Sequence, residues 1–378
     1  MAKHLSVSYT TGACAAAAAQ AAVRFLLRGE RPTSVSLALP GGEEAMFQVK
    51  PYGRTADKMS SAWFAVKKEA CDDPDITAGA YVCARARFGS RAEYPTAYDP
   101  EYVMARSLPR VVIEGGEGVG TVTLPGLQVP PGYAAINKSP LAMIKNEVEL
   151  FTAGTSDSVV VTLSIPGGEE LAKRTFNPRL GITGGLSILG TTGLVRPMSN
   201  EAYLASLVPC IDVVKAAGHE VIYLCPGNLG EKAALALGAP PGSVAQVSNF
   251  VGEMVAAVAK RGFERIVFVG HLGKVAKVAA GHLNTHHQRA PLDLNIVARL
   301  LPGALPELSA RLQGACTAEA AINILREEDL LNILNSVAAQ AAAALQTLVS
   351  ADQELDVVIT DLKGQIVGMS AKEAAWKS

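Results

Sequence analysis

Residues 265–274, RIVFVGHLGK, decide the fold of the second half of the chain. The run after Arg265 is apolar, which predicts a strand buried on both faces of a parallel sheet. A glycine turn follows it, and the residues after Lys274 predict a helix. Because ligands of parallel sheets bind where strands end and helices begin, His271 is a candidate catalytic base and Lys274 is a candidate substrate-binding cation.

Strands and helices alternate on both sides of this stretch. The alternation predicts a C-terminal α/β domain over residues 181–378, with a Rossmann-like parallel sheet and a mainly helical segment near 295–350. The predicted strands are residues 220–224, 244–247, 265–269 and 356–360, with one helix at 229–237 and another that ends near 261. Loops after two of these strands carry ligand-binding candidates, namely Pro226, Gly227, Asn228, Ser248 and Asn249.

Residues 1–180 mix strand patterns with glycine turns, which predicts an N-terminal α+β domain. The predicted boundary lies near residues 177–185, and the glycines between 114 and 120 predict a hairpin. The predicted helices cover residues 13–27, 63–71 and 141–150. The predicted strands cover residues 34–39, 45–49, 81–88, 111–114, 120–124 and 158–165.

Composition excludes several classes of protein. The 378 residues carry 34 Lys+Arg and 35 Asp+Glu, a net charge of −1, and only 5% aromatic residues, unlike a nucleic-acid-binding protein. No apolar stretch approaches the roughly 18 residues of a membrane span. Six cysteines without a C-x-x-C pair predict reduced thiols in a cytoplasmic protein. Sparse charge and the alanine-rich helical region favour a homodimer.

The densest motif is TFNPRLGITGGLSILGTTGLVRPMS at residues 175–199. It predicts a buried strand at residues 187–189 and a helix that begins after Ser199. The loop between them comprises Gly190, Thr191, Thr192 and Gly193. A glycine loop between a strand and a helix is a common cofactor site, although this one is not G-x-G-x-x-G. A tight structural turn is the alternative.

Residues 9–14, YTTGAC, precede an alanine run and predict the start of a helix of small side chains. The open N-terminus of such a helix attracts an anion, which makes Thr10, Thr11 and Gly12 candidates for ligand binding. A capped, tightly packed helix is the alternative. Cys14 is also a candidate nucleophile, although no base neighbours it in the sequence.

Residues 72–77, DDPDIT, place three carboxylates around a proline turn. Crowding can raise the pKa of one carboxyl enough for proton transfer, so Asp73 is a second candidate base. A turn of solvated charges is the alternative.

Three histidines lie close together near residues 282–287. His282 and His286 have the i, i+4 spacing that suits a metal on one helix face. No nearby Cys or Glu completes a ligand set, so the sequence predicts no protein-bound metal.

Seven segments, in this order, resemble the cobalt-precorrin-5B C(1)-methyltransferases of the anaerobic cobalamin pathway, the CbiD family. They are YTTGACAAAAAQAA, DDPDIT, EGGEGVGTVTLPGL, TFNPRLGITGGLSILGTTGLVRPMS, CPGNLGEKA, VSNFVGEM and VGHLGKVAKVAAGHLNTH. The resemblance implies transfer of a methyl group from S-adenosyl-L-methionine to carbon 1 of the tetrapyrrole cobalt-precorrin-5B. The product would be cobalt-precorrin-6A, on the way to vitamin B12. The family lacks the usual methyltransferase glycine motif, in agreement with its absence here.

On this resemblance we expect the cofactor to bind the glycine loop and the strand ends of the second half. The macrocycle would then bind the motifs and cations of the first half and the cation after residue 271; a swap of the two assignments is the alternative. The cofactor-binding candidates are Gly190, Thr191, Thr192, Gly193, Pro226, Gly227, Asn228, Ser248 and Asn249. The substrate-binding candidates are Thr10, Thr11, Gly12, Asp72, Asp75, Asn137, Arg179, Arg196 and Lys274.

Four positions depart from the family pattern. Leu141 stands where the family has arginine, Leu124 where it commonly has lysine, Cys71 where glycine is expected, and His287 where serine is usual. The two lost cations keep open a divergent member that acts on another tetrapyrrole, or a non-catalytic corrinoid-binding protein that need not bind S-adenosylmethionine. A nucleotide-dependent oxidoreductase is a third interpretation, which the missing G-x-G-x-x-G disfavours.

Overall fold

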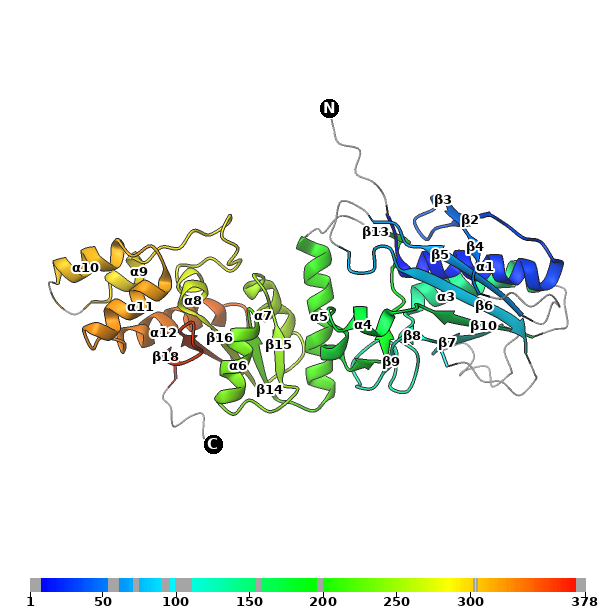
Figure 1. Ribbon diagram of the computed structural model, residues 1–378. Helices are drawn as coiled ribbons and strands as arrows, with labels where there is room; N and C mark the ends of the chain where they lie inside the picture. The colour runs from blue at the N-terminus through cyan, green and yellow to red at the C-terminus, as the bar shows by residue number, and fades with distance from the viewer. Residues whose placement is uncertain are drawn as a thin grey trace, which may run out of the picture. The chain divides into compact units, whose positions relative to one another are not determined.

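The computed structural model describes residues 8–53, 61–70, 75–89, 96–98, 111–153, 158–195, 200–301, 303 and 305–371. Contacts divide the chain into two compact units, residues 1–199 and 200–378. Each unit contains a five-stranded sheet, which is mixed in the first unit and mostly parallel in the second (Figure 1). A mixed-sheet unit followed by a mostly parallel one agrees with the predicted order of an α+β and an α/β region.

The sheet of the first unit has the strand order β4-β5-β6-β10-β7. Strand β10 is parallel to β7 and antiparallel to β6, and the other neighbours are antiparallel. The strands are β4 Lys50–Pro51, β5 Ser61–Lys67, β6 Tyr81–Phe88, β7 Val111–Gly115 and β10 Val159–Ser164.

The helix predicted at residues 63–71 is wrong, because residues 61–67 form strand β5. This strand is paired along both edges, with β4 on one side and β6 on the other. Trp63, Phe64 and Val66 are aromatic or β-branched, and such side chains favour a strand where both edges find partners.

Helix α1, Thr11–Arg28, confirms the helix predicted at residues 13–27 and is buried along almost its whole length. Its alanine side chains let helix α3, Lys138–Thr152, and strands β5 and β6 approach closely. The Thr10 hydroxyl oxygen accepts the Ala13 N–H at 3.2 Å, and Gly29 ends the helix in a left-handed conformation. Helix α1 is therefore the centre of the first unit's core.

Four two-stranded sheets also occur among the described residues of the first unit. Strand β8 pairs in parallel with β12, and β9 pairs with β11. The hairpin predicted at residues 114–120 is therefore wrong, because β7 and β8 flank the turn but pair with different strands. The strands are β1 Ser8–Tyr9, β2 Ser34–Ala38, β3 Glu44–Gln48, β8 Gly118–Val119, β9 Thr121–Val122, β11 Ile182–Thr183, β12 Gly185–Leu186 and β13 Leu194–Val195.

The glycine-rich block lies in the first unit. The strands β11, β12 and β13 find their hydrogen-bonding partners in β9, β8 and β1, so contacts divide the chain between residues 199 and 200. The sequence pattern instead began the second domain at residue 181. Of the strand predicted at residues 187–189, only Ile188 pairs, in an isolated bridge with Ile136. The short helix α4, Gly168–Ala172, and the 3-10 helix η1, Asn177–Leu180, precede the block.

A buried carboxyl lies where α1 meets α3. The Gln20 side-chain amide donates to Glu147 Oε2 at 2.7 Å. Burial raises the pKa of Glu147, and the hydrogen bond from Gln20 offsets part of that rise. The folded protein therefore holds this proton more tightly than the unfolded chain does. The contribution of Glu147 to stability is present below its unfolded pKa and is lost as the pH rises through the folded one.

We expect Glu147→Gln to remove this loss, because the amide keeps the shape of the acid and carries no charge. Urea denaturation at about pH 5 and about pH 8 measures it. Relative to the unchanged protein, the variant should gain free energy of unfolding at the higher pH. The matched control is Glu149→Gln, at an exposed glutamate of the same helix. The same pH dependence in the unchanged protein and in Glu147→Gln would contradict the expectation.

The sheet of the second unit has the strand order β15-β14-β16-β17-β18. The first four strands are parallel, and β18 is antiparallel to β17. These four confirm the predicted strands, with ends that differ by no more than a few residues. The strands are β14 Val221–Cys225, β15 Val244–Gln246, β16 Arg265–His271, β17 Glu354–Thr360 and β18 Ile366–Met369.

The helices of the second unit confirm the predicted alternation with strands and the helical segment near 295–350. Helix α6 contacts β14 and β16, and α12 contacts β17 and β18. The helices are α5 Asn200–Ala216, α6 Asn228–Ala236, α7 Val251–Ala259, α8 Leu272–Ala279, α9 Asn295–Ala298, α10 Pro306–Gln313, α11 Ala318–Glu327 and α12 Ile333–Gln346.

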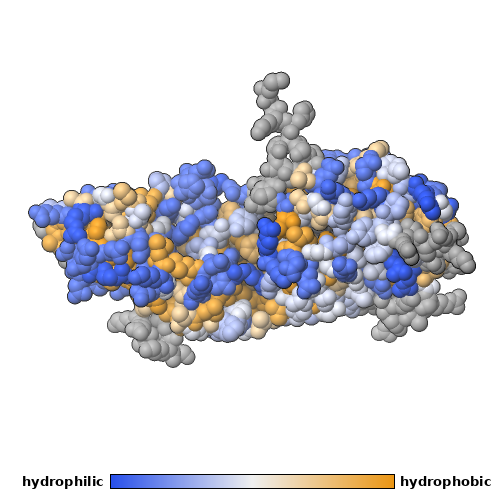
Figure 2. Space-filling model, in the orientation of Figure 1, coloured by the Kyte–Doolittle hydropathy of each residue, from blue (hydrophilic) through white to orange (hydrophobic). Residues whose placement is uncertain are grey.

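Figure 2 shows hydrophilic residues over much of the visible face of each unit, with apolar residues between them. Within the described ranges, no helix has both the length and the apolar character to cross a bilayer. The described cysteines form no disulfide; they are Cys14, Cys83, Cys210, Cys225 and Cys316.

Candidate functional site

The connections of the second unit's sheet reverse direction between β14 and β16. The chain leaves β14 through α6 to reach β15 on one side, and returns through α7 to β16 on the other. In open α/β sheets such a reversal leaves a crevice at the carboxyl ends of the two strands. Pro226, Gly227 and Asn228 follow β14, and His271 ends β16, so the structure brings these predicted site residues to one edge.

Gly227 precedes α6 in an extended conformation, and a Cβ there would meet no atom within 4 Å. Gly230, three residues later, is tightly packed instead. A Cβ there would lie 2.5 Å from the carbonyl oxygen of Val269. Helix α6 thus packs tightly on β16 at Gly230 and leaves open space at Gly227. The first N–H groups of an α-helix have no partner within the helix itself, and such groups suit an anionic ligand group.

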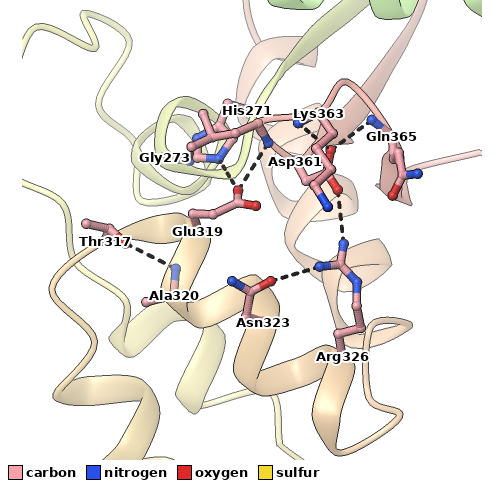
Figure 3. A network of polar contacts seen from close by, with 11 residues as sticks. His271, Gly273, Thr317, Glu319, Ala320, Asn323, Arg326, Asp361, Lys363 and Gln365 are labelled. Atoms are coloured by element: carbon pink, nitrogen blue, oxygen red, sulfur yellow. Dashed lines mark hydrogen bonds and ion pairs between the residues drawn. The ribbon is translucent and has the colours of Figure 1, made fainter.

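His271 is held through both of its ring nitrogens (Figure 3). Its Nδ1 accepts the Gly273 N–H at 3.2 Å, which caps α8, and its Nε2 lies 3.1 Å from Glu319 Oε2. Because Nδ1 accepts, the proton sits on Nε2 and is donated to Glu319. To act as a base, His271 would first have to give up one of these bonds. The arrangement therefore suits a residue that orients the loop after β16.

Asp361 holds the neighbouring strand end. It is fully buried and accepts the Arg326 guanidinium at 3.0 Å, and the N–H groups of Lys363 and Gln365 at 2.9 Å (Figure 3). Glu319 in turn accepts a backbone N–H at 3.1 Å from the residue after Asp361. Helix α11, which carries the glutamate and the arginine, is thus tied to the ends of both β16 and β17.

Sequence reasoning missed Glu319, Arg326 and Asp361. Glu319 is 48 residues from His271, and Arg326 is 35 residues from Asp361, so no local pattern joins them. The one available signal was that Asp361 directly follows the strand predicted at residues 356–360.

A pocket of about 440 Å³ opens after β15. It contains the predicted site residue Asn249, and the preceding Ser248 has a φ of 51°, a left-handed conformation uncommon for serine. Such backbone strain clusters at functional sites. The pocket is lined by Asn200, Tyr203, Asn249, Phe250, Asn284, His286, Gln288 and Arg289.

Two lysines of α8 bond to the segments that line this pocket. The Lys274 ammonium donates to Asn249 Oδ1, and Lys277 Nζ donates to the Thr285 carbonyl at 3.2 Å. Burial lowers the pKa of both lysines, and the charge of Lys277 lowers the pKa of Lys274 further. Burial and four neighbouring cations, His287 first, also lower the pKa of His286. The surroundings of the pocket are therefore electrically positive.

In the first unit, the structure brings together motifs that lie far apart in the sequence. The segment 188–193 accepts or donates hydrogen bonds at the starts of α1 and α3, and a Cβ on Gly190 would overlap the Thr10 side chain. Close packing therefore explains Gly190, while a ligand-binding role for the loop stays a prediction. Four predicted substrate-binding residues bond to this segment, namely Thr10, Thr11, Gly12 and Asn137.

Asp75 forms an ion pair with Lys68, a residue to which the sequence pattern assigned no role. Lys68 is only 2% exposed, and Asp75 also accepts the N–H and hydroxyl of Thr77 at 2.8 and 2.6 Å. Burial alone would raise the pKa of Asp75, but these hydrogen bonds outweigh it and lower the pKa. An ionised Asp75 suits holding the turn more than accepting a proton. The predicted site residues Asp72, Asp73 and Arg196 lie outside the described residues.

The remaining residues that the sequence singled out are a cysteine, two histidines and an arginine. Burial raises the pKa of Cys14 to about 12, which keeps the thiol protonated and argues against a nucleophile. His282 and His286 follow the end of α8, so no helix sets their spacing. In the described part of the chain, no three His, Cys, Asp or Glu residues gather as metal ligands. Arg179 lies in η1 of the first unit.

The positions that depart from the family pattern differ in exposure. Leu124 is 39% exposed and lies against Gly181 at the start of the glycine-rich block. Leu141 is buried in α3. Cys71 lies outside the described residues.

Comparison with known proteins gives matches over nearly the whole chain. Residues 1–197 match the family model CbiD, and residues 284–371 match the model of the CbiD C-terminal domain. A protein of Moorella thermoacetica named cobalt-precorrin-5B C(1)-methyltransferase is 40% identical over 373 residues, covering 97% of this chain and 96% of its own. A protein of the same name from Methanocaldococcus jannaschii is 37% identical, with 97% and 96% covered.

A solved structure of cobalamin biosynthesis protein (cbiD) from Archaeoglobus fulgidus is 25% identical to this chain. The alignment covers 75% of this chain and 83% of that one, with a TM-score of 0.39. That score is too low to support an argument about the fold.

Proposed function

Because the chain belongs to the CbiD family, we propose that it is a methyltransferase that converts cobalt-precorrin-5B to cobalt-precorrin-6A in cobalamin biosynthesis, with S-adenosylmethionine as the methyl donor. The observation that carries the proposal is the similarity to enzymes of that name along both chains from end to end. A cytoplasmic location and a homodimer remain predictions from the sequence.

The reaction forms a bond between carbon 1 of the macrocycle and the methyl carbon. It breaks the bond from the methyl carbon to sulfur, whose electron pair leaves with S-adenosylhomocysteine. The macrocycle supplies the electron pair of the new bond and releases one proton, so its net gain is one methylene. An in-line displacement of this kind depends on alignment of the two reactants more than on a strong acid or base. The engagement of both nitrogens of His271 agrees with this, since a residue that fixes a loop serves alignment.

We place S-adenosylmethionine in the crevice between the ends of β14 and β16, on a Rossmann-like sheet. The open space at Gly227 fits such a ligand, because the backbone there can be approached closely. The N–H groups at the start of α6 would receive the methionine carboxylate. His271, held by Glu319, would fix the opposite loop of the crevice. The cluster around Thr10 and Gly190, which belongs to the first unit, stays a predicted ligand-binding surface.

The experiment is an anaerobic incubation of the purified protein with S-adenosylmethionine and cobalt-precorrin-5B, followed by mass spectrometry. We expect the tetrapyrrole to gain one methylene mass while S-adenosylhomocysteine forms in step. No gain with intact S-adenosylmethionine binding would indicate a different tetrapyrrole. No binding of S-adenosylmethionine would overturn the proposal in favour of a corrinoid-binding protein.

Gly227→Val tests the placement of the donor. Valine adopts the extended conformation of Gly227, and its Cβ would meet no protein atom within 4 Å, so we expect the fold to be unchanged while the crevice is filled. We expect the Kd for S-adenosylhomocysteine to rise roughly tenfold or more, as lost contacts of about 1.4 kcal/mol would produce. Isothermal titration measures it. The control is Gly41→Val, where the first unit also leaves open space. An unchanged Kd in Gly227→Val would move the donor elsewhere.

A further inference from the structure

We propose that the pocket after β15, lined by Asn249, Asn284, His286 and Arg289 among others, is a subsite for a carboxylate side arm of the tetrapyrrole. That the carboxylate belongs to a tetrapyrrole rests on the proposed function. That the pocket takes an anion rests on the hydrogen bonds and charges described next.

Two asparagines in the wall have their acceptor oxygens occupied. Asn249 Oδ1 accepts the Lys274 ammonium, and Asn284 Oδ1 accepts the His286 N–H at 3.2 Å. Ammonium and backbone N–H groups only donate, so these contacts fix which end of each amide is the oxygen. Each asparagine therefore has its two side-chain N–H donors available for a ligand.

The acceptor nitrogen of the His286 ring is also occupied. Its Nδ1 accepts the Gln288 N–H at 3.3 Å, so in the neutral ring the proton is on Nε2, a donor. Arg289 adds a guanidinium that, within the described residues, forms no ion pair. Asn200 and Gln288 can turn either end of their amides toward a ligand. Four side chains that line this pocket thus have N–H donors left over, which matches a group that only accepts, such as a carboxylate.

The charges of two lysines beside the pocket also favour an anionic ligand. Lys274 and Lys277 are held by an amide oxygen and a backbone carbonyl, and among the described residues neither forms an ion pair. Buried charges in proteins are ordinarily paired, because an isolated buried cation is costly. A ligand carboxylate in the pocket would supply the missing negative charge. The lowered pKa values of both lysines and of His286 agree with an uncompensated positive site.

The same surroundings disfavour S-adenosylmethionine here, although the sequence pattern assigned Ser248 and Asn249 to it. That molecule carries an ammonium and a sulfonium against a single carboxylate, and the two lysines would repel its net positive charge. Acetate and propionate arms of a tetrapyrrole carry only negative charge. We therefore assign the pocket to the macrocycle and the crevice at Gly227 to the donor.

Asn284→Asp tests the proposal in the full-length protein. The new carboxylate keeps the oxygen that accepts the His286 N–H and replaces the two donors with a negative charge of the same shape. The matched control is Asn323→Asp on α11, where the side chain accepts from Arg326 and makes no part of the pocket. Thermal unfolding checks that both variants remain folded.

The probes are cobyrinic acid, a stable cobalt corrinoid with carboxylate arms, and cobinamide, in which the arms are amides. We expect Asn284→Asp to weaken cobyrinic acid binding roughly tenfold or more, since hydrogen bonds to charged groups have that effect. Its affinity for cobinamide and for S-adenosylhomocysteine should stay within about threefold of the unchanged protein, as should all three affinities of Asn323→Asp.

Three outcomes overturn the subsite. They are failure of the unchanged protein to bind cobyrinic acid at millimolar concentration, equal binding by Asn284→Asp, and a loss of S-adenosylhomocysteine binding instead, which would assign the pocket to the donor. The methylation assay is independent of all three. If the unchanged protein forms product while Asn284→Asp binds cobyrinic acid normally, the function stands and the subsite does not.

Discussion

Gly185→Ala is expected to destabilise the first unit severely, by about 3 kcal/mol or more, because overpacking against a rigid backbone cannot be relieved. A Cβ on Gly185 would overlap the carbonyl of Gly118 in the paired strand β8. Strand β8 cannot retreat, since the position of a Cβ on Gly118 lies only 1.9 Å from the carbonyl oxygen of Ile165. Three stretches of backbone meet there with no space for a side chain.

The adjacent Gly184 is the matched control. It has a φ of +79°, and a Cβ there would meet nothing within 4 Å. Gly184→Ala should therefore cost only the strain of a left-handed residue, about 1 kcal/mol. Hydrogen exchange of peptides that span β8 and β12 measures both variants within the first unit. Equal protection in the two variants would show that the backbone contact at Gly185 is not rigid.

Lys68→Met is expected to lower the free energy of unfolding of the first unit by about 3–5 kcal/mol, as loss of one partner of a buried ion pair does. Lys68 is 2% exposed, so Asp75 would be left largely buried without its counter-charge. The pair joins two residues that flank the predicted base Asp73 in the sequence. We expect exchange in β5 and in residues 75–80 to rise together.

The double variant Lys68→Met with Asp75→Asn separates charge from packing. Removing both partners leaves no unpaired charge, so it should recover much of the stability that Lys68→Met loses. Urea denaturation monitored by hydrogen exchange compares the unchanged protein, the single variants Lys68→Met and Asp75→Asn, and the double variant. If the double variant is as unstable as the sum of the two single variants, the two side chains are not coupled and the ion pair does not account for the loss.

Helices and strands whose residues are uniformly apolar or uniformly small could be predicted from the sequence. Strand β16 is an apolar run bounded by charge and glycine, and α1 is an alanine run between a threonine cap and a glycine. Strand β5 was not, because both of its edges are paired and its side chains do not alternate cleanly. The partners that make it a strand lie elsewhere in the chain, where local periodicity carries no information.

The candidate site also has one part that the sequence predicted and one part that it did not. Parallel strands all end at one edge, so Pro226–Asn228 and His271 were placed together from pattern alone. The partner of His271 came from a helix whose sequence gives no sign of it, and the occupied oxygens of Asn249 and Asn284 appear only in three dimensions. Glycines were the least reliable guide, because a glycine that admits a ligand and one that admits another backbone look alike in sequence.

Strand β1 pairs with β13, so the beginning and the end of the first unit are hydrogen-bonded to each other. During synthesis on the ribosome, α1 emerges early, but the strands and the helix that cover it, and the segment that binds its start, emerge later. A nascent chain that stops short of residue 195 lacks the partner of β1 and leaves the alanine helix without its full cover. The first unit therefore completes its fold only when its last strand has been made.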